Sequence, residues 1–144
     1  MRESSGRLVA VKKTVISQQR KRRIEVFKRE LSALSRMSHQ NVIGMYGAGI
    51  DPCGPEFIFV ILEKCDMDGW SYVNNIFQPS FKEKFDKGIL EAWADLAEGC
   101  SHMASKGILH RDLTLDNILV SNAPGKQCFK VSDFGVSGVA ADFN

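Results

Sequence analysis

The residues 110–117 read HRDLTLDN and the residues 131–135 read VSDFG, and these two stretches decide the fold. Short apolar runs at 118–120 and 129–131 lie between them. Runs rich in β-branched and aromatic residues that are bounded by turn residues are typical of strands. We therefore predict two short strands that flank the polar side chains of the two stretches, among them Asp112, Asn117 and Asp133.

Together the two stretches resemble the eukaryotic-type protein kinase family, whose catalytic loop has the pattern HRDxxxxN and is followed by a DFG triplet. VAVK at 9–12 resembles the VAIK strand of that family, and FKREL at 27–31 lies where its αC helix would place Glu30. The resemblance covers essentially the whole chain but only the middle of the family domain. It implies an α+β fold with two lobes, ATP and Mg²⁺ as cofactors, and a protein substrate.

By this resemblance, residues 1–62 form a small, mainly β N-lobe with an αC helix, 63–70 form the hinge, and 71–144 begin a helical C-lobe that holds the catalytic loop. The sequence pattern fits that order. We expect strands at 8–12, 41–50 and 56–62, and a turn at 51–55. Apolar residues at helical spacing predict a helix from 24 to about 38 and a second that includes 90–103 and stops near Gly107. A further turn is expected around Asn122, Pro124 and Gly125.

Glu30 falls within the apolar arc of its predicted helix. A carboxylate there is costly unless a cation meets it, and Lys12 on the preceding strand is the candidate. The resemblance implies the same pair, in which Lys12 holds the α and β phosphates of ATP. The alternative is that both residues are ordinary surface charges.

The resemblance assigns the remaining catalytic roles as well. Asp112 would orient the substrate hydroxyl, while Asn117 and Asp133 would bind Mg²⁺. Without the motif, these three would be turn residues with local backbone hydrogen bonds. The family also implies an adenine site and a regulatory stack. The adenine site would use Ala10, Leu119, the gatekeeper Leu62 and the backbones of Glu63 and Cys65, and the stack would be Leu34, Met45, His110 and Phe134.

The chain departs from the family pattern at both ends. Eleven residues precede Lys12, and they lack the glycine-rich loop that would cover the phosphates, so ATP binding should suffer. Nine residues follow Gly135, with no APE triplet and no later C-lobe helices. In the family those helices cover the underside of the catalytic loop. We therefore expect exposed apolar surface around Trp93, marginal solubility, and weak or no activity of the chain as it stands.

Composition sets broader bounds. The chain has 144 residues, 44% of them hydrophobic, and a net charge of +2, which fits one globular domain and gives no sign of a nucleic-acid partner. No apolar run is long enough for a membrane span. The four cysteines lack disulfide or zinc spacing, which favours free thiols and an intracellular, cytoplasmic location. The basic run at 20–23 is either a solvated helix start, a localisation signal or a docking patch for an acidic peptide.

Three functions compete. The leading one is a protein kinase that acts on Ser or Thr, with Tyr left open because Thr114 stands where serine/threonine kinases usually have Lys. The second is a non-catalytic, kinase-like binding module. The third, a small-molecule phosphotransferase, is disfavoured by Arg111, which in protein kinases contacts a phosphorylated activation segment. Substrate and oligomeric state are not readable from the sequence.

Overall fold

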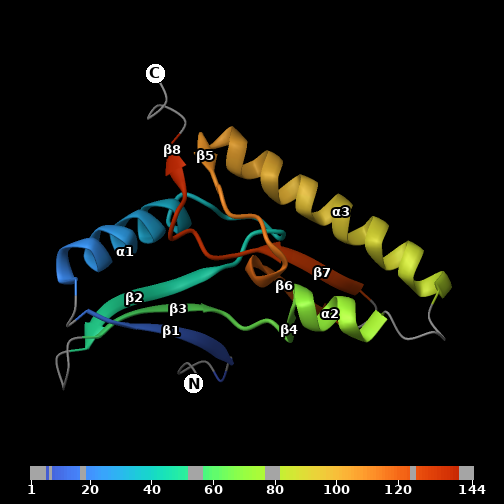
Figure 1. Ribbon diagram of the computed structural model, residues 1–144, viewed down its shortest axis with the longest axis horizontal. Coiled ribbons are helices and arrows are strands. Elements are labelled where there is room, and N and C mark those ends of the chain that lie inside the picture. The colour runs from blue at the N-terminus through green and yellow to red at the C-terminus, as the bar shows by residue number, and fades with distance from the viewer. Residues whose placement is uncertain are drawn as a thin grey trace.

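The computed structural model describes Gly6 and residues 8–16, 19–51, 57–76, 82–123 and 126–139. Within these ranges, only the backbone is described for 76, 82–87, 123 and 139. The turns predicted at 51–55 and at 124–125 lie outside the described residues, apart from Asp51. Figure 1 shows a sheet with helix α1 at one end of the molecule and the long helix α3 at the other.

The first region contains a three-stranded antiparallel sheet made of β1 (Val9–Val15), β2 (Met45–Asp51) and β3 (Phe57–Glu63). β3 lies in the middle, so the strand order is β1-β3-β2. β1 runs three residues further than predicted. β2 begins at Met45 rather than at 41 because Val42 instead makes an isolated parallel bridge to Val131 in the second region.

Helix α1 spans Arg20–Leu34, so it begins four residues before the predicted start and ends before the predicted end. The basic run forms its first turn, because Arg and Lys favour helices even where apolar periodicity has not begun. At the other end, the backbone N–H of Met37 donates to Leu34 O at 3.2 Å, which tightens the last turn. Met37 still packs against the core, and this explains the longer prediction.

The second region begins with β4 (Met67–Asp68) and α2 (Gly69–Ile76). Residues 63–70 are predicted as a hinge, and no helix is predicted at the position of α2. Asp68 Oδ1 accepts a 2.7 Å hydrogen bond from the backbone N–H of Ser71, which satisfies one of the unpaired donors at the helix start. The division of the chain at residues 62 and 70 stays a prediction.

Helix α3 (Lys82–Ser105) follows, and it stops where predicted because Gly107 has φ +68°, a left-handed conformation that suits glycine after a helix. The other elements are β5 (Ile108–Leu109), the 3₁₀ helix η2 (Leu115–Asn117), β6 (Ile118–Ala123), β7 (Lys126–Val131) and β8 (Gly138–Val139). The predicted hairpin is present, since β6 pairs antiparallel with β7. β4 pairs antiparallel with the other edge of β6, and β5 pairs antiparallel with β8.

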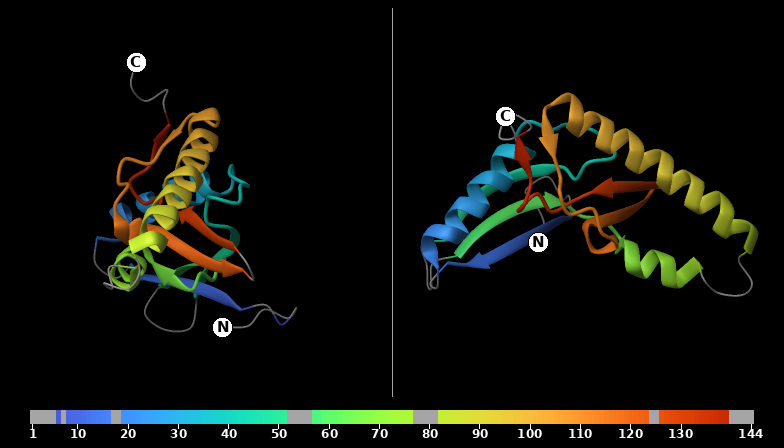
Figure 2. Two further views of the ribbon diagram at one scale, coloured as in Figure 1. Left: turned by 90° about the vertical axis from the view of Figure 1, so that its right-hand side faces the viewer. Right: turned by 45° about the horizontal axis from the view of Figure 1, so that its top comes forward.

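One buried core joins the two regions. The right-hand view of Figure 2 shows α1 with the first sheet on the left and α3 with the hairpin on the right. The core draws on α1, β3, α3, β7 and the loops between them. Its buried members are Ala33, Leu34, Val42, Ile43, Val60, Met103, Ile108, Val131 and Phe134. Because a single core spans both regions, the elements that carry the polar motifs are held in fixed relative positions.

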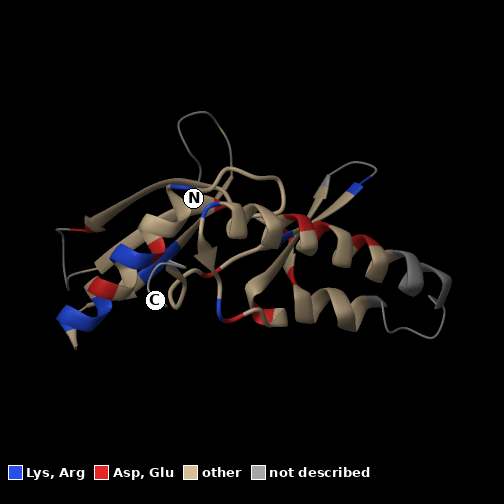
Figure 3. Ribbon diagram, turned by 90° about the horizontal axis from the view of Figure 1, so that it is seen from above, with Lys and Arg blue, Asp and Glu red and all other residues tan. Residues whose placement is uncertain are grey.

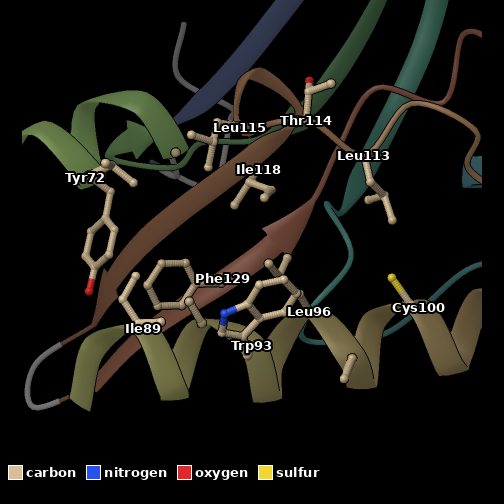
Figure 4. Close-up of a pocket in the computed structure, with 14 residues that line it drawn as sticks. Tyr72, Ile89, Trp93, Leu96, Cys100, Leu113, Thr114, Leu115, Ile118 and Phe129 are labelled. Carbon is tan, nitrogen blue, oxygen red and sulfur yellow. The ribbon is translucent and has the colours of Figure 1, made fainter. Parts of the chain in front are cut away.

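Part of α3 remains uncovered, as the sequence predicted. Trp93 is 68% exposed and Leu90 is 70% exposed. Trp93 lines an apolar groove of about 530 Å³ between α2, α3 and the loop at 110–117. Figure 4 shows Trp93, Ile118 and Phe129 around this groove. The expected apolar surface is confirmed, whereas its effect on solubility stays a prediction. No helix among the described residues is both long and apolar enough to cross a membrane.

Gly99 on α3 provides a test of the packing. A Cβ atom at this position would lie 2.6 Å from the backbone oxygen of Asn41, a fully buried residue. We expect Gly99→Ala to lower the free energy of unfolding by about 1–3 kcal/mol through overpacking, measured by urea denaturation. Helix propensity alone predicts the opposite sign, a gain of up to about 1 kcal/mol. The exposed Ser101→Ala variant on the same helix is the control, and a Gly99→Ala variant more stable than wild type would contradict the packing.

Candidate active site

Lys12 of β1 stands at the centre of a charged cluster. Its Nζ donates a 2.8 Å hydrogen bond to Glu30 Oε1 of α1 and a 3.0 Å hydrogen bond to Asp133 Oδ1. These residues are 18 and 121 positions away in the sequence. The Glu30 side chain is only 6% exposed, against 38% for Lys12 and 46% for Asp133. The predicted pairing of an inward-facing Glu30 with Lys12 is therefore present.

The pairing shifts the pKa of both solvent-facing partners. Burial tends to lower the pKa of Lys12, but the hydrogen bonds and charges of Glu30 and Asp133 outweigh it, so its pKa is raised. Burial likewise tends to raise the pKa of Asp133, but the Lys12 ammonium outweighs it, so its pKa is lowered. Both groups therefore stay charged from below pH 3.8 to above pH 10.5, and the cluster contributes its full stabilisation across the neutral range.

Asp112 and Asn117 face each other across the loop between β5 and β6. The Asn117 side-chain amide donates 2.9 Å hydrogen bonds to both the backbone oxygen and Oδ2 of Asp112. Because the side-chain nitrogen of Asn117 donates both of these bonds, its carboxamide oxygen takes no part in the contact with Asp112. The Asn117 backbone oxygen accepts bonds of 2.8 and 3.0 Å from the N–H and hydroxyl of Ser132. Since Ser132 directly precedes Asp133, these bonds bring the two motifs together.

Phe134 and His110 support the site from beneath. Phe134 is fully buried in the core, and the His110 ring packs edge-on against it with centroids 5.0 Å apart. The Asp112 backbone N–H donates to His110 Nδ1 at 3.3 Å, which leaves Nε2 to donate to Ser132 O at 2.8 Å. His110 thereby ties the catalytic loop to the segment that carries Asp133. Leu34 lies in the same core and Met45 packs against it, so the four expected stack residues are gathered around one cluster.

Two residues at the site adopt a left-handed backbone that the sequence analysis did not anticipate. Arg111 has φ 71° and Asp133 has φ 60°. Such conformations cost non-glycine residues about 1–2 kcal/mol each and persist where surrounding contacts fix them, often at functional sites. Next to Asp133, a Cβ on Gly135 would lie 3.3 Å from Asp133 Oδ1, the same oxygen that accepts a hydrogen bond from the Gly135 N–H.

The residues expected around adenine lie along β1, β3 and β6. Ala10 is the direct cross-strand partner of Leu62. Leu62, Cys65 and Leu119 all pack, partly buried, against the main core. The Glu63 backbone N–H is already bonded to Gly44 O at 2.8 Å, so a ligand at this position could use only the Glu63 carbonyl. Their role in nucleotide binding stays a proposal.

Lys130 is a contributor that sequence reasoning missed. Its Nζ lies 3.2 Å from Glu63 Oε2, and the Lys130 side chain is only 9% exposed. The same ammonium donates to the Gln40 backbone oxygen. The buried ammonium of Lys130 on β7 thus holds the side chain of Glu63, the last residue of β3, in place. The sequence carried no signal for this contact, because strand alternation places Lys130 on the face opposite to Phe129 and Val131.

Cys65 allows a chemical test of its environment. Burial, with a smaller contribution from the charge of Glu63, raises the pKa of the Cys65 thiol to about 11. At pH 8 the reactive thiolate is then about 100-fold rarer than in a thiol of the ordinary pKa. We expect iodoacetamide to alkylate Cys65 about 100-fold more slowly than a free cysteine peptide, measured by mass spectrometry of the digested protein. Alkylation at the rate of the peptide would contradict this buried, apolar role.

The charged side chains of the site line a cavity of about 410 Å³. They include Lys12, Glu30, Asp112 and Asp133. Among the described residues, no three His, Cys, Asp or Glu side chains gather into a metal site. In nucleotide sites, Mg²⁺ takes one or two protein ligands and completes its shell with phosphates and water. Asp133 carboxylate and Asn117 carboxamide oxygens are hard donors of this kind, and Lys12 adds a cation for phosphate.

A β-rich region with one helix, a short connector, and a lysine that joins a helix-borne Glu to a later Asp are the features of a two-lobed phosphotransferase. The family model described as "Protein kinase domain" matches residues 1–142. The chain belongs to the protein kinase family, and its fold is a partial α+β kinase fold.

Curated relatives include kinases for different acceptors. The chain is 30% identical over 107 residues to the serine/threonine-protein kinase atg1 of Dictyostelium discoideum, covering 74% of this chain and 15% of that protein. It is 32% identical over 136 residues to the probable cyclin-dependent kinase 10 of the same organism, covering 94% and 35%. An Ack-related non-receptor tyrosine kinase of Caenorhabditis elegans is 28% identical over 121 residues, covering 81% and 11%. The chain thus spans about a third or less of these relatives.

Proposed function

We propose that this chain carries the catalytic centre of a protein kinase that transfers the γ-phosphoryl group of ATP to a Ser or Thr hydroxyl of a protein. The observation that supports it most is the bonding of Lys12 to both Glu30 and Asp133 across 121 residues of sequence. Phosphoryl transfer is catalysed mainly by positioning and by neutralising charge, and this cluster supplies both at one place.

In this proposal Lys12 binds the α and β phosphates. Glu30, nearly buried and bonded to Nζ, restricts the lysine to one direction, so less side-chain freedom is lost when phosphate binds. The net charge of Lys12, Glu30 and Asp133 is −1, so the cluster needs further positive charge before it can accept a triphosphate. Mg²⁺, when bound, neutralises the charge of the phosphates, and Asp133 with Asn117 would hold it.

Asp112 is the proposed base for the acceptor hydroxyl. Its Oδ2 accepts a hydrogen bond from Asn117, which fixes the carboxylate plane, and the backbone bond to His110 fixes the loop behind it. A carboxylate so oriented can accept the hydroxyl proton as the phosphoryl group is transferred. Adenine would lie against Ala10, Leu62 and Leu119, with its polar edge at the backbones of Glu63 and Cys65.

Ser or Thr is proposed as acceptor because serine/threonine kinases are prominent among the relatives, although a tyrosine kinase is also among them. An intracellular location is proposed from the thiols of Cys65, Cys100 and Cys128, which are free of disulfides.

The second candidate function, a kinase-like binding module without transfer, is favoured by the open apolar groove beside α3, which is a surface suited to a partner.

An assay with radiolabelled ATP distinguishes the protein kinase from the binding module. The purified chain is incubated with [γ-³²P]ATP, Mg²⁺ and a mixture of protein substrates, and incorporated label is counted. We expect weak, Mg²⁺-dependent incorporation that falls at least about 100-fold in Lys12→Met, because the phosphate contact is lost. Lys13→Met, the exposed neighbour on β1, is the matched control and should retain the wild-type rate. Absence of transfer by the wild-type chain, or equal loss in both variants, would leave the binding module as the better reading.

A further inference from the structure

Two arginines of the basic run lie on the wall of the charged cavity. Arg22 and Arg23, in the first turn of α1, line the same cavity as Asp112 and Asp133. The roles assigned above to Lys12, Glu30, Asp112, Asn117 and Asp133 leave these two arginines without one. Figure 3 shows the Lys and Arg residues gathered at the start of α1.

Arg23 has a fixed position relative to the site. Its guanidinium donates to the backbone oxygen of Val15 at the end of β1, the strand that carries Lys12. Glu30 lies seven residues further along α1, and at 1.5 Å per residue the two Cα positions are about 10 Å apart along the helix axis. The two arginines therefore line the cavity from the N-terminal end of α1, whereas Glu30 lines it from a position nearer the C-terminal end of the same helix.

The two arginines differ from Lys12 in their pairing. Lys12 is paired with Glu30 and Asp133, whereas no carboxylate among the described residues forms a salt bridge with Arg22 or Arg23. Both side chains are exposed. Guanidinium groups bind carboxylate and phosphoryl groups through paired hydrogen bonds, so a ligand that places an anionic group here would gain affinity and a defined orientation.

We propose that Arg22 and Arg23 bind an anionic side chain of the acceptor protein, a carboxylate or a phosphorylated residue, close in sequence to the hydroxyl that is phosphorylated. The inference rests on the proposed function, because the acceptor hydroxyl is placed at Asp112. Because the two arginines line the same cavity as Asp112, an anionic side chain close in sequence to the acceptor hydroxyl could contact them. The two arginines thus determine a preference for acidic acceptor sequences.

The test compares two acceptor peptides that differ only in having Asp or Asn at the three positions on either side of one Ser. We expect the wild-type chain to favour the Asp peptide about tenfold in kcat/KM. In the Arg22→Glu, Arg23→Glu double variant this ratio should fall to one or below, while the KM for ATP stays unchanged. Lys28→Glu with Arg29→Glu is the matched control, since it makes the same charge change at exposed positions of α1 outside the cavity wall and should keep the preference.

A phosphoserine version of the peptide distinguishes the two anionic sources, because a stronger preference for it would assign the site to phosphorylated acceptors. Equal kcat/KM for the Asp and Asn peptides in wild type would overturn the inference and leave the kinase function standing. A rise in the KM for ATP in the double variant, without a change in peptide preference, would overturn it too, by assigning the arginines to the nucleotide. If the wild type transfers no phosphate, fluorescence anisotropy of the labelled peptides still decides, with loss of Asp-peptide binding in the double variant expected.

Discussion

Asp112→Asn should lower kcat for phosphoryl transfer by about 10²–10⁴-fold, because the amide cannot accept the proton of the acceptor hydroxyl. The Asn117 amide would lose its carboxylate partner, but the backbone oxygen of Asp112 would still accept one bond from it. Lys12 and Asp133 do not contact the substituted side chain, so the Kd for ATP should stay within about twofold of wild type. Single-turnover rates and isothermal titration separate these two quantities.

Asp116→Asn is the control, since Asp116 is an exposed carboxylate in the same loop. It should leave kcat unchanged. If Asp112→Asn and Asp116→Asn reduced kcat equally, the effect would be one of net charge in the loop, and Asp112 would lose its assigned role. If Asp112→Asn retained wild-type kcat, the catalytic assignment of the whole loop would be wrong.

Phe134→Ala should lower the free energy of unfolding by about 3–5 kcal/mol, as expected for truncating a fully buried aromatic ring. This is a large fraction of the roughly 5–15 kcal/mol that separates folded from unfolded domains. The ring also supports His110, whose hydrogen bonds connect Asp112 to Ser132, so the site should loosen together with the core. Urea denaturation followed by circular dichroism gives the change in stability.

Val136→Ala serves as the comparison, because Val136 lies two residues away and is 49% exposed. Its effect should stay within about 0.5 kcal/mol. Equal stabilities of the Phe134→Ala and wild-type proteins would show that this ring does not hold the two regions together, contrary to the packing described above.

The sequence was sufficient to predict the pairing of Lys12 with Glu30 because that prediction needed only local periodicity and the cost of a lone buried charge. Glu30 lies on the inner face of its helix wherever the helix begins, so the error of four residues in the start of α1 did not matter. The contact between Lys12 and Asp133 was accessible only through the family resemblance, since nothing local links residues 121 positions apart.

The features that sequence reasoning missed depend on tertiary contacts. α2 has a weak sequence signal, because it begins in a polar segment whose residues are typical of a turn. Its start becomes recognisable only from the hydrogen bond that the Ser71 backbone N–H donates to the Asp68 carboxylate. Lys130 belongs to a strand whose neighbours are apolar, and only the folded chain shows Glu63 beside its ammonium. The left-handed backbones of Arg111 and Asp133 follow from constraints imposed on both sides, which composition does not show.

The most direct test of the central claim is a crystal structure of the chain with a non-hydrolysable ATP analogue and Mg²⁺. We expect a triphosphate bonded to the Lys12 ammonium, with the metal bound by Asp133 and Asn117 and the terminal phosphate facing Asp112. A nucleotide seated elsewhere, for instance in the apolar groove between α2 and α3, with Lys12 still bonded only to Glu30 and Asp133, would contradict it.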